Sequence, residues 1–194
     1  MAEASLIMGV DPGLANTGWG VVEDRGARIV PVAYGCIETD SSLEMAQRLS
    51  IIYSKITAAC ERYRPQELSI EEIYFGANTK SAIATAHARG AVLVAAGCRQ
   101  MAVGEYTPMQ IKKAVVGTGA AEKNQVQYMV QAVLELDHQP KPDHAADALA
   151  AAICHARMRG AGSSSRRMNR HMHQQATERS AWTALVHKKE EGRA

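Results

Sequence analysis

The chain has 194 residues, 46% of them hydrophobic, so it is long enough to bury a core within one domain. No apolar run approaches the roughly 20 residues that a membrane-spanning helix needs, and the N-terminus lacks the pattern of a signal peptide, so we expect a cytoplasmic protein without a membrane segment. Residues 160–194 carry seven Lys and Arg against three Glu, whereas residues 1–159 carry 15 basic and 17 acidic groups, so the net charge of +2 does not by itself indicate a nucleic-acid partner.

Three extended segments open the chain. Residues 6–10 form a short apolar run closed by Pro-Gly, and residues 17–22 resume an extended pattern after a short turn. Residues 28–38 give a third strand, in which Pro31 suits an edge position because proline cannot donate to a central ladder. Short connections between the three segments predict an antiparallel meander.

Helical and extended patterns alternate in the next part. Ser41 and Glu44 have the spacing of a capping box, and apolar residues follow at helical intervals until Pro65. The further predicted elements are a strand over 67–75, an alanine-rich helix over 79–97, a strand over 101–107 and helices over 121–135 and 142–159. This order predicts an α/β fold with a five-stranded mixed sheet, its first three strands antiparallel and strands four and five parallel, and helices on both faces.

From about Gly160 the composition changes to small, basic and histidine residues. We therefore expect a domain over residues 1–159 and a basic, flexible C-terminal tail over residues 160–194. The arginines and histidines of this tail could add nonspecific DNA affinity, but disorder explains the same composition.

Two carboxylates end predicted strands. Asp11 closes the first strand before Pro-Gly, and Glu71 lies near the end of the fourth. Taken singly, an aspartate before Pro-Gly, such as Asp11, is most often a turn former. Surface exposure explains Glu71 about as well as a functional role does.

A third carboxylate is harder to explain as surface. The stretch "AADALAAAIC" (residues 145–154) is apolar around the whole helix, which indicates burial on nearly all sides, yet it contains Asp147. His144, three residues earlier, shares the face of Asp147. A buried helix does not carry an unpaired aspartate without cost, so this position points to ion binding.

The predicted fold brings these residues together. Strands one and four are expected to lie side by side and parallel, with the last helix across them, so that Asp11, Glu71, His144 and Asp147 converge. Their mutual repulsion favours a divalent cation, and oxygen-rich ligands favour Mg²⁺ or Mn²⁺. Two such ions per site can hydrolyse a phosphodiester by in-line displacement, which predicts a nuclease or phosphoryl transferase.

Five stretches in order carry a resemblance to a known family: "GVDPGLANTGWGVV", "SIEEIYFGANTKSA", "HARGAVLVAA", "VVGTGAAEKNQVQYMV" and "DHAADALAAAICH". Over about residues 5–158 the chain resembles the RuvC family of bacterial Holliday-junction resolvases, in the ribonuclease H-like superfamily. The resemblance implies a ribonuclease H-like fold and a metal-dependent crossover junction endodeoxyribonuclease.

The resemblance also assigns the acids. Asp11, Glu71 and Asp147 match family catalytic and metal-binding positions, and the remaining ligand position, usually aspartate, is His144 here. Asp143, just before it, is a weaker candidate. Because imidazole supplies a nitrogen ligand and removes a negative charge, we expect Mn²⁺ to support more activity than Mg²⁺.

DNA contacts follow from the same comparison. Lys112 and Lys123 match family lysines that hold phosphates, with Lys113 as a weaker candidate. Tyr74 matches an aromatic that stacks at the opened junction centre, and Phe75 is the alternative. Without the resemblance, these residues would be interpreted as solvated lysines and a core aromatic.

The expected partners are four-way junction DNA, a second copy of the chain and the branch-migration helicase complex of RuvA and RuvB. In the family, the helix that matches residues 79–97 pairs across a twofold axis, and small residues here would permit close approach: Ala82, Ala84, Ala86, Ala88, Gly90 and Ala91. The implied reaction is a pair of symmetric nicks that leave 5′-phosphate and 3′-hydroxyl ends, during homologous recombination and DNA repair.

Other interpretations remain open from the sequence. An ATPase of the actin and hexokinase group shares an Asp-x-Gly loop but needs a second domain and a second phosphate motif. A junction-binding protein that has lost catalysis would be free to lose its acids, and a ribonuclease H-like nuclease acting on RNA would use the same chemistry at its metal site.

Overall fold

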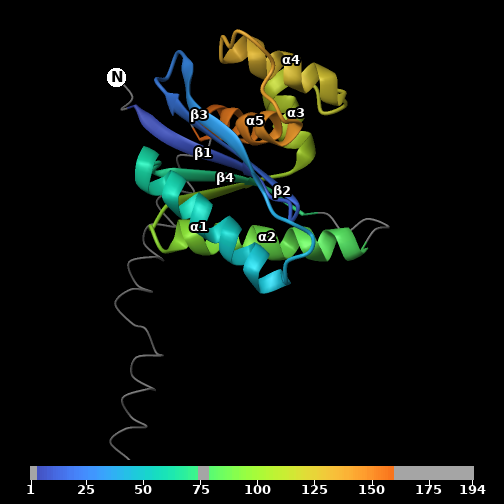
Figure 1. The fold of residues 1–194 in the computed structure, drawn as a ribbon. Coiled ribbons are helices and arrows are strands. Elements are labelled where there is room, and N and C mark those ends of the chain that lie inside the picture. The colour runs from blue at the N-terminus through green and yellow to red at the C-terminus, as the bar shows by residue number, and fades with distance from the viewer. Residues whose placement is uncertain (1–3, 74–78, 160–194) are drawn as a thin grey trace, which may run out of the picture. The chain divides into compact units, whose positions relative to one another are not determined.

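A computed structural model describes residues 4–73 and 79–159 (Figure 1). Its strands and helices, in chain order, are β1 (Ser5–Asp11), β2 (Asn16–Asp24), β3 (Ile29–Glu38), α1 (Met45–Tyr63), β4 (Glu67–Glu71), α2 (Thr79–Gly97), β5 (Ala102–Tyr106), α3 (Pro108–Val116), α4 (Lys123–Val133) and α5 (Asp143–Met158). Within these residues no helix is both long enough and apolar enough to cross a membrane.

The five strands form one mixed sheet in the order β3-β2-β1-β4-β5. The β1–β2 and β2–β3 pairs are antiparallel, and the β1–β4 and β4–β5 pairs are parallel, which confirms the predicted meander followed by parallel strands. Pro31 lies in the edge strand β3, as expected for a residue without a backbone N–H.

Helices cover both faces of this sheet (Figure 1). On one face, Met8, Val10 and Ile70 pack with residues of α1 and α2. On the other, Ile7 and Val22 pack with residues of α3, α4 and α5. Because side chains alternate along a strand, neighbouring residues of β1 serve different cores.

Two element boundaries differ from the sequence prediction. A turn closed by Asp40 occupies residues 40–43, so Glu44 with Gln47, and not Ser41 with Glu44, forms the capping box of α1. Strand β4 ends at Glu71, short of the predicted residue 75.

Helix α3 was not predicted, although its start and end signals are present. Thr107 and Gln110 form a capping box, Pro108 occupies the first turn, and Gly117 closes the helix with a positive φ of 90°. These are standard local signals, and the short length of the helix conceals them between a strand and a loop.

Two glycines let α5 lie directly on the sheet. A Cβ on Gly9 of β1 would lie 2.0 Å from the carbonyl oxygen of Ala148, and a Cβ on Gly18 of β2 would lie 1.8 Å from that of His144. Neither distance is sterically possible, so only glycine permits the contact. The close approach places the first turn of α5 beside the end of β1.

The far end of α5 is held by a buried polar group. His155, only 5% exposed, bonds Glu67 Oε2 at 2.7 Å through Nε2 and the Tyr106 hydroxyl at 2.8 Å through Nδ1. These partners come from β4 and β5, so α5 is fixed to the sheet at both ends.

Candidate metal centre

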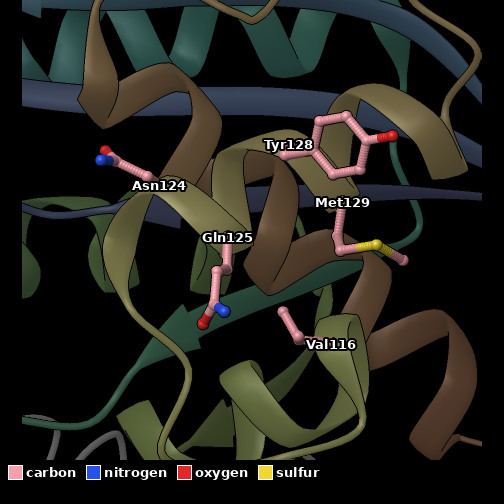
Figure 2. Close-up of a pocket in the computed structure, with 5 residues that line it drawn as sticks. All are labelled: Val116, Asn124, Gln125, Tyr128 and Met129. Carbon is pink, nitrogen blue, oxygen red and sulfur yellow. The ribbon is translucent and has the colours of Figure 1, made fainter.

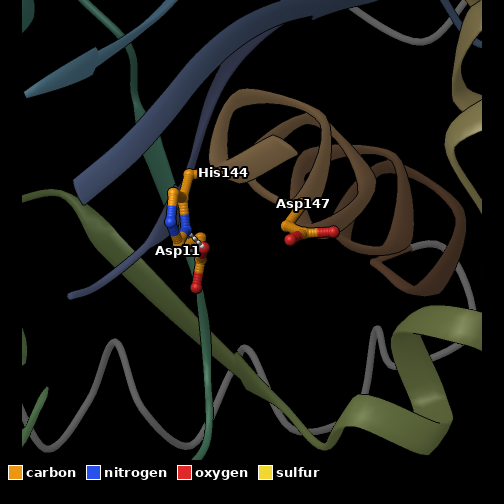
Figure 3. A group of neighbouring side chains, drawn as sticks. All are labelled: Asp11, His144 and Asp147. Atoms are coloured by element: carbon orange, nitrogen blue, oxygen red, sulfur yellow. Dashed lines mark hydrogen bonds and ion pairs between the residues drawn. The ribbon is translucent and has the colours of Figure 1, made fainter. Parts of the chain in front are cut away.

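Asp11, His144 and Asp147 form a cluster at the end of β1. One ligand atom from each of the three lies within 4.8 Å of the others (Figure 3). Asp11 is the last residue of β1, and the other two lie in the first turns of α5, one turn apart. The predicted convergence of these three residues is therefore observed.

His144 and Asp11 form a direct hydrogen bond: Nδ1 of the imidazole lies 2.8 Å from Oδ2 of the carboxylate. When the imidazole is neutral, this bond requires the proton on Nδ1 and leaves the lone pair on Nε2. His144 is 40% exposed and Asp11 24% exposed, so a cation in solution can reach both.

Glu71 lies next to this cluster without belonging to the closest group. It ends β4, one residue beyond the Val10–Ile70 pair of the parallel β1–β4 ladder. Burial, and then the charges of Asp11 and Asp147, raise its pKa to about 7. The Glu71 carboxylate therefore lies close enough to Asp11 and Asp147 for their charges to disfavour its ionised form.

Asp147 has a raised pKa for the same reasons. Burial contributes most and the charge of Asp11 adds to it, whereas Lys123 and His144 act in the opposite direction. Two carboxylates whose charged forms are penalised, next to the Asp11 carboxylate and the His144 imidazole, make a donor set that a divalent cation would stabilise. The residues present thus fit a metal ion of the oxygen- and nitrogen-binding class.

Lys123 bridges two acids at this site. Its ammonium lies 3.1 Å from Oδ2 of Asp143 and 3.6 Å from Oδ2 of Asp147. The hydrogen bond to Asp143 is the main reason that the pKa of Lys123 is raised. Lys123 is the first residue of α4, so this helix start faces the acids.

Asp143, the weaker ligand candidate, pairs with residues of α4 and lies outside the cluster of Asp11, His144 and Asp147. Its side chain is 60% exposed, and hydrogen bonds from Lys123 and then Gln127 lower its pKa. It does not belong to the closest group of possible ligands among the described residues. Gln127 was not singled out from the sequence, although it lies one turn after Lys123 on α4.

Two adjacent lysines of α3 are distinguished by their surroundings. The charge of Lys112 lowers the pKa of Glu71, which places Lys112 near that carboxylate. Lys113 is exposed, and its backbone carbonyl accepts the hydrogen bond from the N–H of Gly117 that caps the end of α3. Tyr74 and Phe75, the predicted stacking residues, lie outside the described residues.

A shallow hollow of about 380 Å³ lies apart from these acids, between α3 and α4 (Figure 2). Val116, Asn124, Gln125, Tyr128 and Met129 line it. None of the predicted site residues is among them, so this hollow is not part of the metal cluster.

Comparison with known proteins gives the relatives of the chain. The sequence profile described as "Crossover junction endodeoxyribonuclease RuvC" matches residues 7–155. The protein of that name from Syntrophomonas wolfei is 48% identical over 149 residues, which are 77% of this chain and 87% of the relative. The one from Pelotomaculum thermopropionicum is 49% identical over 151 residues, 78% and 92% of the two chains.

Solved structures agree. RuvC of T. thermophilus, determined in complex with a Holliday junction substrate, superimposes with a TM-score of 0.75 at 36% identity, over 78% of this chain and 93% of that one. The yeast mitochondrial Holliday junction resolvase Ydc2 has the same fold at 9% identity, with a TM-score of 0.58 over 78% of each chain. The fold is thus ribonuclease H-like, and the chain belongs to the RuvC family of crossover junction endodeoxyribonucleases.

Proposed function

We propose that this chain is a divalent-metal-dependent endonuclease that resolves four-way DNA junctions by paired, symmetric nicks. The observation that carries the proposal is the meeting of Asp11, His144 and Asp147 within 4.8 Å, in a chain of the RuvC family. The junction-bound relative from T. thermophilus supports junction DNA as the substrate.

Asp11, Glu71, His144 and Asp147 are proposed as the metal ligands and catalytic residues. A pair of Mg²⁺ or Mn²⁺ ions held there would activate a water molecule and stabilise the leaving 3′ oxygen. Strand β1 and helix α5 hold Asp11, His144 and Asp147 in place. The buried residues of these two elements also keep water away from the side of the site that faces the core. The P–O3′ bond breaks as the water oxygen bonds to phosphorus, so the products are 5′-phosphate and 3′-hydroxyl ends.

Lys123 and Lys112 are proposed as phosphate contacts. In the absence of DNA, Lys123 is held by Asp143 and Asp147, and Lys112 lies near Glu71. Both cations are thus close to where a scissile phosphate must lie if the four ligands are correct. Lys113, Tyr74 and Phe75 remain weaker candidates for DNA contacts.

His144 favours Mn²⁺ over Mg²⁺ at this site. Imidazole nitrogen suits the softer ion, whereas carboxylate and water oxygens suit both. The Nδ1 bond to Asp11 supports a role as ligand, because it orients the ring and leaves Nε2 with a lone pair. Better activity with Mg²⁺ across the pH range would count against this assignment.

Helix α2 is proposed as the surface that contacts a second copy. Ile83 is 48% exposed and Val94 56% exposed, and eleven residues apart they share one face. A Cβ on Gly90 would meet nothing within 4 Å, so the helix surface there is open to a close neighbour. Ala88, in contrast, is buried in the chain's own core, in the cluster that holds Val10 and Ile70 of the sheet.

The remaining assignments rest on family membership alone. They are action beside the RuvA and RuvB branch-migration complex, a cytoplasmic location and a role in recombination and repair. The basic tail over residues 160–194 lies outside the described residues and stays a prediction, as does the domain boundary at residue 159.

The chief alternative is a junction-binding protein with impaired catalysis, for which the His144 exchange is the support. The geometry favours activity, because Asp11 and Asp147 are retained at ligand distance with Glu71 beside them. A ribonuclease H-like nuclease acting on another substrate is the second alternative.

One assay on labelled synthetic four-way junctions tests the proposal. Wild type and Glu71→Gln are compared under Mg²⁺ and Mn²⁺, with Glu72→Gln as the control for the same change one residue further on. We expect paired symmetric nicks from wild type and Glu72→Gln, and junction binding without cleavage from Glu71→Gln. Normal cleavage by Glu71→Gln would show that the proposed site is wrong.

A further inference from the structure

The backbone carbonyl of Glu71 lacks its regular partner in the sheet. The N–H of Glu72 donates to the Tyr106 carbonyl of β5 at 2.9 Å, so the carbonyl of Glu71, in the same peptide unit, points the opposite way, toward β1. Continuing the register beyond the Val10–Ile70 pair, this oxygen would accept from the backbone nitrogen of residue 12. Residue 12 is proline, which has no N–H to donate.

Arg89 of α2 supplies a donor to this carbonyl. Its Nε lies 3.3 Å from the Glu71 oxygen, and its terminal nitrogen pairs with Glu105 of β5. The Arg89 side chain is only 17% exposed, so it is confined between the helix and the strand ends. A single guanidinium thus holds the backbone of β4 and the side chain of β5 together.

The arginine acts from the face of the sheet opposite to the metal cluster. Ile70 packs in the core with Ala88 and Val92 of α2, beside Arg89. Because side chains alternate along a strand, the carboxylate of the next residue, Glu71, projects to the other face, where Asp147 lies. Arg89 therefore restrains the backbone of Glu71 from the face of the sheet that α2 covers, whereas the Glu71 carboxylate projects to the face on which Asp147 lies.

We propose that Arg89, held by Glu105, is a positioning residue that fixes the carboxylate of Glu71 for metal binding. This inference rests on the proposed function of Glu71 as a ligand. Strand β4 ends at Glu71, so without the Arg89 bond nothing in the parallel ladder on the β1 side would restrain its carbonyl. A loosened strand end would let the carboxylate move away from Asp11 and Asp147.

Direct Mn²⁺ binding to the DNA-free protein, followed by electron paramagnetic resonance, tests the inference. Arg89→Met keeps much of the apolar stem but removes the donors, and we expect about tenfold weaker Mn²⁺ binding, as for the loss of other groups that orient ligands. Arg99→Met is the matched control, because Arg99 follows α2 and pairs with Glu61 of α1. It should leave Mn²⁺ binding unchanged, and unfolding midpoints measured in EDTA should fall no further for Arg89→Met than for Arg99→Met.

Wild-type Mn²⁺ affinity in Arg89→Met, or an equal loss in Arg99→Met, would overturn the positioning role. If Arg89→Met does not fold, Glu105→Gln takes its place: weaker Mn²⁺ binding supports the inference and unchanged binding overturns it. Junction cleavage by the wild type separates the two proposals. If the wild type binds Mn²⁺ and cleaves junctions, and Arg89→Met binds Mn²⁺ equally well, only the role of Arg89 is refuted. If the wild type neither binds Mn²⁺ nor cleaves junctions, the proposed function and this inference are refuted together.

Discussion

Nδ1 of His144 and Oδ2 of Asp11 lie 2.8 Å apart, although 133 positions separate the two residues in the chain. The bond joins the end of β1 to the first turn of α5, the two elements that carry the closest group of possible ligands. It gives the Asp11 carboxylate a donor in the absence of metal, and it sets which imidazole nitrogen faces an incoming ion.

Replacement of His144 by aspartate should change the metal preference. His144→Asp substitutes an oxygen ligand for nitrogen, so we expect the ratio of cleavage rates in Mn²⁺ and Mg²⁺ to fall by roughly tenfold. Rates on a synthetic four-way junction in each metal measure this ratio. His138→Asp, the same change at an exposed histidine before α5, should leave the ratio as it is in wild type. An unchanged ratio in His144→Asp would remove His144 from the ligand set.

The raised pKa of Glu71, about 7, predicts a stability that depends on pH in metal-free protein. The folded state binds this proton more tightly than the unfolded state, whose carboxyl has a pKa near 4.5, so stability falls as pH rises between these values. Glu71→Gln removes the penalty. At pH 8 in EDTA it should raise the free energy of unfolding by about 1–2 kcal/mol, less than the full shift implies because the carboxylate is partly exposed.

The gain should shrink toward pH 5, where wild-type Glu71 is already protonated when folded. Thermal unfolding of both proteins across this range checks the trend, and Glu72→Gln serves as the control for the same substitution one residue further on. Equal stability of wild type and Glu71→Gln at pH 8 would show that ionisation of Glu71 costs the folded protein no free energy.

Much of the fold and part of the candidate site could be predicted from the sequence. The alternation of Ile7, Met8 and Val10 between two cores follows from the period of a strand, and the all-apolar helix around Asp147 indicates burial directly. Together with a parallel arrangement of strands one and four, these local patterns lead to the meeting of Asp11, His144 and Asp147.

The rest depends on contacts that no local pattern encodes. Lys112 and Lys113 are neighbours on a helix, so about 100° of rotation decides which one approaches Glu71, and only packing sets that rotation. The bond from Arg89 to the Glu71 carbonyl depends on Pro12, which is distant from both in sequence. Helix α3, by contrast, has readable capping signals at Thr107 and Gly117, and was missed because it is short.

Gly18→Ala tests whether close packing of α5 builds the site. The new Cβ would lie 1.8 Å from the His144 carbonyl oxygen, so the first turn of α5 must move. We expect a loss of about 1–3 kcal/mol in the free energy of unfolding, together with weaker Mn²⁺ binding. At Gly97, the last residue of α2, an added Cβ meets nothing within 4 Å, so Gly97→Ala should cost no stability. Retention of Mn²⁺ affinity in Gly18→Ala would show that the ligands do not depend on this contact.

Lys123→Met removes the cation that bridges Asp143 and Asp147. If Lys123 transfers to a DNA phosphate when substrate binds, the variant should lose one counterion-releasing contact. The slope of log affinity against log salt for a four-way junction should then fall by about one, and the cleavage rate should drop by about 100-fold through the loss of a charge near the scissile phosphate. Lys55→Met, at an exposed position of α1 on the other face of the sheet, is the matched control and should change neither quantity. A normal salt slope with a reduced rate would confine Lys123 to ordering Asp147, and a normal rate would remove it from the site altogether.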